Sequence, residues 1–61
     1  MRNIMVTDYD NEANVAIFTE TLTVEEVKKR LEKKGDKYSD IFEVPDDDLQ
    51  HYCYEPTWLE S

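Results

Sequence analysis

Three short stretches of this sequence carry residue types that could do chemistry. The first, Asp8-x-Asp10-x-Glu12, spaces three carboxylates as the opening of a calcium-binding loop does. Such a loop needs glycine at its sixth position and a bidentate glutamate at its twelfth, but these positions hold Ala13 and Thr19. We therefore expect a polar turn here rather than a calcium site.

The second stretch, His51-x-Cys53, offers two ligands for zinc. A tetrahedral site needs three or four ligands, and the chain has no other histidine or cysteine. As a nucleophile, Cys53 would need His51 within reach, which a strand allows and a helix does not. A chain of 61 residues is also too short to enclose a substrate pocket easily. The sequence therefore predicts no metal, no cofactor and no enzymatic activity.

The third stretch combines acids with aromatic rings. Six acids fall between residues 36 and 48, and Tyr52, Tyr54 and Trp58 follow them. On an extended chain, carboxylates two residues apart lie about 6.6 Å apart, comparable to successive phosphates of one nucleic acid strand. Tyrosine and tryptophan are typical of binding hot spots. We predict that these residues bind a partner: Glu43, Asp46, Asp47, Asp48, Tyr52, Tyr54 and Trp58.

The net charge of −8 is unevenly distributed along the chain. Residues 1–22 carry −3, residues 23–35 carry +2 and residues 36–61 carry −7. This distribution disfavours direct binding to a phosphate backbone and favours a basic protein partner. The acidity would also keep a small protein dissolved without any partner. The cations of residues 23–35 leave open a weaker alternative, a nucleic-acid-binding helix.

The rest of the chain is organised around a predicted helix within Leu22–Gly35. Thr23 and Glu26 form a capping box, Leu22 and Val27 a hydrophobic staple, and Gly35 suits a left-handed C-cap. Its apolar residues repeat at helical spacing as Val24, Val27 and Leu31. A helix this short is marginal alone, so we expect it to pack on a sheet.

Three stretches have strand character: Asn3–Thr7, Val15–Thr19 and Ile41–Val44. The polar residues 8–14 join the first two as a hairpin. Met5, Ala16 and Phe18 then face away from the helix. We expect their cover to come from either the C-terminal segment or a second copy of the chain.

Residues 46–54 fit either a helix or a strand. Leu49, Tyr52 and Cys53 have helical spacing, whereas Leu49, His51 and Cys53 alternate as in a strand. Pro45 and a capping Asp46 favour a short helical turn. The sequence at Glu55-Pro56 ends either element, which leaves residues 57–61 as a tail.

The predicted fold is therefore a single α+β domain spanning residues 1–61. We expect a ββαβ order, an antiparallel sheet with strand order 2-1-3, one helix on one face, and a short C-terminal helical turn. One cysteine permits no internal disulfide, and neither a signal peptide nor a long apolar run is visible. We expect a soluble protein of the cytoplasm.

In size and acidity the chain resembles small virus-encoded proteins that block bacterial enzymes acting on nucleic acid, such as anti-CRISPR, antirestriction and glycosylase inhibitors. This likeness concerns composition and assigns a role to no particular residue. It implies a phage protein that works in the host cytoplasm as a nucleic-acid mimic. The leading hypothesis is an inhibitor or regulator of a basic, nucleic-acid-handling protein. The alternative is a homo-oligomeric structural protein, at its simplest a homodimer, that buries its C-terminal aromatic residues.

Overall fold

The computed structural model describes residues 1–58 of the chain. Its elements, in chain order, are β1 (Arg2–Tyr9), β2 (Ala13–Thr19), α1 (Val24–Lys34), β3 (Asp40–Glu43), α2 (Asp46–Leu49) and β4 (Glu55–Trp58). The prediction of a small α+β domain with one main helix is confirmed. Each predicted strand is found, with boundaries shifted by one or two residues.

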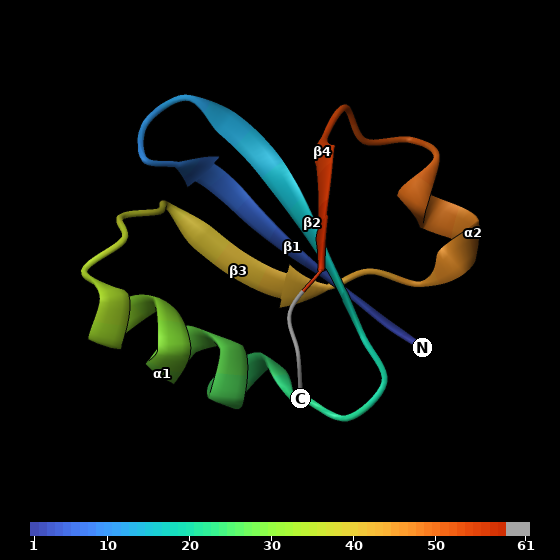
Figure 1. The fold of residues 1–61 in the computed structure, drawn as a ribbon. Helices are drawn as coiled ribbons and strands as arrows, with labels where there is room; N and C mark the ends of the chain where they lie inside the picture. The colour runs from blue at the N-terminus through green and yellow to red at the C-terminus, as the bar shows by residue number, and fades with distance from the viewer. Residues whose placement is uncertain (59–61) are drawn as a thin grey trace.

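The strands form one mixed sheet in the order β3-β1-β2-β4 (Figure 1). β1 is antiparallel to both β2 and β3, as predicted. The prediction of a wholly antiparallel, three-stranded sheet is wrong, because β4 adds a fourth strand that runs parallel to β2. The predicted C-terminal helical turn is present as α2, and the predicted order is extended by β4.

The sequence predicts that Glu55-Pro56 ends the preceding element and that residues 57–61 form a tail, but β4 begins at Glu55 and runs to Trp58. Pro56 has no backbone N–H to donate, and it is aligned with Ala16 of β2. β4 lies at the edge of the sheet, and an edge strand tolerates proline because only one of its sides is paired. Residues 59–61, the remainder of the predicted tail, lie outside the described residues.

The β1–β2 turn reverses the chain without glycine. Asp8, Asp10 and Asn11 adopt left-handed φ values of 51°, 53° and 63°. Aspartate and asparagine tolerate this conformation better than other non-glycine residues. The N–H of Asn11 donates to the carbonyl of Asp8 at 2.9 Å, which closes the turn. The register of the β1–β2 pairing shifts between Val6 and Tyr9, next to this turn.

The predicted capping of α1 is confirmed in detail. The Oγ1 of Thr23 accepts from the N–H of Glu26 at 3.3 Å, and the Glu26 carboxylate accepts from the N–H of Thr23 at 3.3 Å. The side chain of Thr19, at the end of β2, accepts from the N–H of Leu22 at 3.1 Å. These bonds fix the direction in which the chain enters α1.

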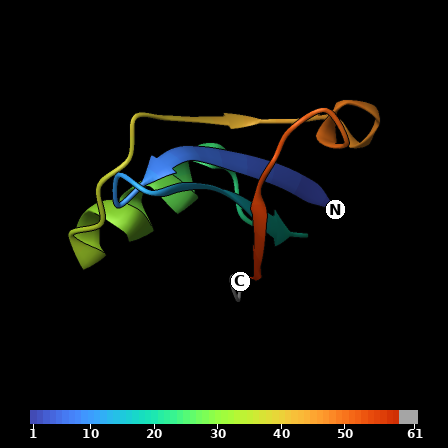
Figure 2. The same cartoon turned by 90° about the horizontal axis from the view of Figure 1, so that it is seen from above.

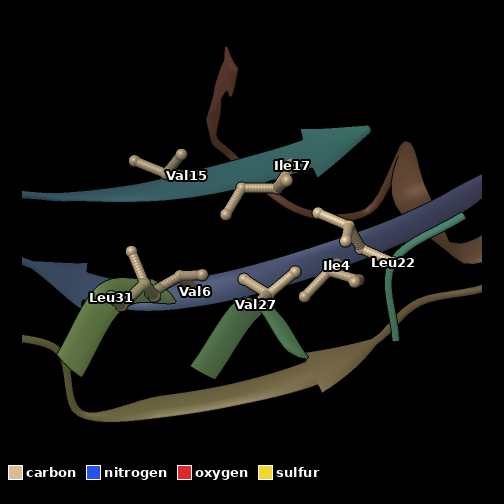
Figure 3. Packing of buried hydrophobic residues seen from close by; sticks show 7 residues of the cluster. All are labelled: Ile4, Val6, Val15, Ile17, Leu22, Val27 and Leu31. Atoms are coloured by element: carbon tan, nitrogen blue, oxygen red, sulfur yellow. The ribbon is translucent and has the colours of Figure 1, made fainter. Parts of the chain in front are cut away.

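The larger core cluster lies between α1 and the sheet. The side chains that meet there come from β1, β2 and α1 with its preceding residue: Ile4, Val6, Val15, Ile17, Leu22, Val27 and Leu31 (Figure 3). All seven are buried. Since β1 and β2 contribute alternate residues to this cluster, one face of each strand is buried against α1.

The other face of the sheet carries a smaller core cluster of Met5, Ala16 and Val44. Phe18, Phe42, Leu49 and Tyr54 pack against it. Of the two covers expected for this face, the structure uses the chain's own C-terminal segment. As a result, α1 and α2 lie on opposite sides of the molecule in both Figure 1 and Figure 2. Among the described residues, no helix has the length and apolarity needed to cross a membrane.

The C-cap of α1 gives a first prediction. Gly35 has φ 81°, and its N–H donates to the carbonyl of Glu32 at 3.1 Å. Nothing lies within 4 Å of where a Cβ would stand, so the cost of a side chain there is conformational. We expect Gly35→Ala to lower the free energy of unfolding by about 1–2 kcal/mol.

The control for this prediction is Gly35→Asn, because asparagine tolerates the left-handed region and should cost less than alanine. Both variants are compared with the parent chain by thermal and denaturant unfolding. Equal stability of the alanine variant and the parent would contradict the assigned C-cap.

Candidate functional site

Most of the predicted binding residues that are exposed lie on α2 or directly after it. We define the α2 surface as Asp46, Asp47, Asp48, His51 and Tyr52, all of which are exposed. The three aspartates occupy the first turn of α2, where carboxylates complement the helix dipole. Successive helical residues point about 100° apart, so the aspartates fan out around the turn. The phosphate-like spacing of carboxylates on an extended chain therefore does not apply to these three aspartates.

One buried side chain ties the α2 surface to the sheet. Asn3 on β1 is only 5% exposed. Its amide Nδ2 donates to the carbonyl of Val44 at 3.2 Å and to the carboxylate of Asp46. Asp46 was expected to cap the helix, but Pro45 is the N-cap residue and caps nothing with its side chain. Asp46 is instead the first helical residue, and it accepts a hydrogen bond from the sheet.

The aromatic residues divide into a packed ring and a more exposed one. The ring of Tyr54 is half-buried and meets Phe18 edge-on, with centroids 6.3 Å apart. Tyr52 is 39% exposed, and its ring lies 6.1 Å from that of Phe42 in a tilted arrangement. The Tyr52 side chain is thus more accessible than that of Tyr54.

The remaining predicted binding residues do not join the α2 surface. Glu43 alternates with Phe42 along β3, which places it on the sheet face that α1 covers, and its carboxylate lies 3.6 Å from Arg2 Nε. The backbone of Trp58 pairs with Phe18 at the end of β4, while its side chain lies outside the described residues. The seven predicted residues are therefore dispersed over three regions.

A second polar cluster, missed in the sequence, joins the β1–β2 turn to the loop before β3. The N–H of Asp10 donates to the carbonyl of Lys37 at 2.7 Å, and the N–H of Lys37 donates to the Asp10 carboxylate at 3.4 Å. The hydroxyl of Ser39 donates to the Asp8 carboxylate at 2.8 Å. These partners are 27 and 31 residues apart, so only the packed sheet brings them together. The carboxylates of Asp8 and Asp10, two of the three considered for a calcium loop, thus accept hydrogen bonds from this loop.

Tyr9 and Asp36 form the best-connected polar pair of this cluster. The Tyr9 hydroxyl donates to Asp36 Oδ2 at 2.5 Å, and Lys34 Nζ lies 3.4 Å from the same oxygen. The hydrogen bond to Asp36, reinforced by burial and by the charges of Asp36 and Asp10, raises the pKa of Tyr9 to about 12. The hydrogen bond from Tyr9, helped by Lys34, lowers the pKa of Asp36 despite its partial burial.

His51 and Cys53 are both exposed, and Cys53 is a free thiol. Within residues 1–58, no three side chains of histidine, cysteine, aspartate or glutamate gather closely enough to hold a metal ion. Comparisons with protein families, with curated proteins and with solved structures find no match to this chain. The function is therefore inferred from the geometry and charge of the molecule.

The buried amide of Asn3 gives a second prediction. Asn3→Ala leaves the carbonyl of Val44 without this donor and removes the link to Asp46. We expect a loss of about 1–3 kcal/mol in the free energy of unfolding, together with faster hydrogen exchange in residues 48–52. Asn14→Ala is the control, because its two side-chain hydrogen bonds are long and exposed. Equal losses in the two variants would contradict the role assigned to Asn3.

The Tyr9–Asp36 pair gives a third prediction, about pH. A tyrosine pKa raised from 10.0 to about 12 stabilises the fold fully below pH 10 and ceases to do so as the pH rises to about 12. The lowered pKa of Asp36 stabilises the fold above its ordinary value of 3.8, an effect lost as the pH falls below it.

Tyrosinate absorbance and unfolding measured against pH test this prediction, with Tyr9→Phe as the variant that lacks the hydroxyl. Between pH 10 and pH 12 the free energy of unfolding should therefore fall less in the variant than in the parent chain. A stability difference between parent and variant that does not change between pH 9 and pH 12 would contradict the assignment.

Proposed function

We propose that this chain is a binding protein that docks on a basic, nucleic-acid-handling protein and inhibits or regulates it. The supporting observation is the separation of charge across the sheet. α1, on one side, carries five cations and three acids. Residues 44–54, which cover the other face, carry three acids and neither lysine nor arginine. The segment that bears the α2 surface therefore has formal charges of one sign only.

The α2 surface has the features of a docking site for a basic groove. It is held in place by Asn3 and by the half-buried Leu49, so its carboxylates are presented without a large ordering cost. Tyr52 supplies an amphipathic ring beside them. Charges arranged in this way steer a basic partner toward the surface and accelerate association.

Competition for a groove that normally receives nucleic acid follows from the same charge. A cleft lined with lysine and arginine binds phosphates mainly through electrostatics, and a carboxylate surface uses the same cations. Self-association through the α2 surface is the weaker alternative, since it would bring six aspartates together. Like charges at a contact oppose binding.

A pair of matched double variants tests the proposal. Asp47→Asn with Asp48→Asn removes two charges from the α2 surface and spares Asp46, which contacts Asn3. Glu20→Gln with Glu32→Gln removes two charges from exposed positions elsewhere. Each chain is immobilised, exposed to a bacterial lysate at low and high ionic strength, and the retained proteins are identified.

We expect the parent and the Glu20/Glu32 variant to retain the same basic protein at low ionic strength. The Asp47/Asp48 variant should bind this protein about tenfold more weakly, and high salt should release it. The parent chain should also inhibit the nucleic-acid activity of the retained protein. Retention that is insensitive to salt and equal for both variants would refute the proposal.

A further inference from the structure

One border of the sheet is formed by β3, which among residues 1–58 pairs with β1 alone. Figure 2 shows β3 along the outer side of the molecule, with no other described segment of the ribbon beyond it. We call the side of β3 that faces away from β1 the β3 edge. Its backbone groups have no strand partner, and such an edge is a template on which another extended chain can add.

The hydrogen bonds to β1 show which backbone groups of β3 lie at the β3 edge. The N–H of Val44, directly after β3, donates to the carbonyl of Asn3 at 2.8 Å. In an antiparallel pair, residues that exchange hydrogen bonds with the partner alternate with residues that do not. The backbone groups of Phe42 therefore also face β1, whereas those of Ile41 and Glu43 point outward.

One of these outward groups is occupied by a side chain of β3 itself. The N–H of Ile41 donates to Oδ1 of Asp40 at 2.8 Å. The exposed carboxylate of Asp40 therefore lies at the β3 edge, where it accepts from the donor that an incoming strand would use. It also places a negative charge where the carbonyls of that strand would approach. Charged side chains are a common protection of edge strands.

Without this carboxylate, the β3 edge is complementary to β3 of a second copy. Two copies related by a two-fold axis at Phe42 would pair antiparallel, with Ile41 of each copy opposite Glu43 of the other. The outward groups of both residues then find partners, and the two Phe42 side chains meet in the position where cross-strand contacts are closest. A register centred on Glu43 would instead place two carboxylates opposite each other, which is destabilising.

We propose that Asp40 keeps the chain monomeric by closing the β3 edge to β3 of a second copy. The protection uses both properties of the side chain: the oxygen that occupies the N–H of Ile41 and the charge that repels an approaching carbonyl. The net charge of −8 also opposes association, but salt screens that longer-range repulsion. This inference concerns a different surface from the proposed function and does not depend on it.

Sedimentation velocity over a range of protein concentrations tests this proposal with two substitutions. Asp40→Ala removes the acceptor and the charge, whereas Asp40→Asn removes the charge and keeps an oxygen that can accept from the N–H of Ile41. Glu20→Ala is the matched control, because it removes a carboxylate from an exposed position outside the β3 edge.

At about 0.15 M salt we expect the parent and the Glu20→Ala chain to sediment as monomers. The Asp40→Ala chain should self-associate at least about tenfold more tightly than the parent, and the Asp40→Asn chain should lie between them. Adding Glu43→Pro to Asp40→Ala should abolish the association, because proline removes an outward N–H and spares the bonds to β1. Amide spectra show whether each chain is folded.

Amide hydrogen exchange at low protein concentration tests the contact within the monomer. Glu43 is the reference, because its N–H also points outward. After correction for intrinsic rates, we expect Ile41 to exchange more slowly than Glu43 in the parent and at a similar rate in the Asp40→Ala chain. Similar rates for the two amides in the parent would overturn the assigned contact.

The sedimentation results decide the proposal independently of the proposed function. A dimeric parent, or an Asp40→Ala chain that is as monomeric as the parent, would overturn it. Equal association of the Asp40→Ala and Asp40→Asn chains would overturn the role of the hydrogen bond, and association that survives Glu43→Pro would place the contact elsewhere. High salt should strengthen self-association of the Asp40→Ala chain but release a basic partner, so the two proposals fail separately.

Discussion

The structure depends on β1 being buried on both faces. Ile4, Met5 and Val6 are consecutive and fully inaccessible, so their side chains enter both core clusters. A central strand of this kind cannot be stable with cover on one face only, because apolar area on the other would remain in water. α1 covers one face, and the segment from Val44 to Tyr54 covers the other.

This requirement also sets the electrostatics of the molecule. The basic helix and the acidic segment are each amphipathic, and each buries its apolar residues against a different face of the same sheet. Their charged residues consequently point away from one another. A separation of charge that is visible along the sequence thus becomes a separation in space, and such fields guide association with charged partners.

The segment after β3 has two roles that constrain each other. Leu49 and Tyr54 must pack inward to cover Met5 and Ala16, while the aspartates and Tyr52 remain exposed. The bond from Asn3 to Asp46 holds the α2 surface to the sheet. A surface that is already ordered when free loses less entropy when it binds.

The sequence alone determined the features that depend on near neighbours. The capping box of Thr23, the left-handed Gly35 and the strands around Ile4 and Ile17 all follow from local propensity and periodicity. The sequence named Asp46 and the aromatic residues as candidates for binding, but it did not predict where they lie relative to one another. Tertiary structure alone decided that β4 pairs with β2 despite Pro56, that Asn3 holds Asp46, and that Asn14 meets Cys53. These contacts join residues about forty positions apart, and their energy comes from burial that no short window of sequence contains.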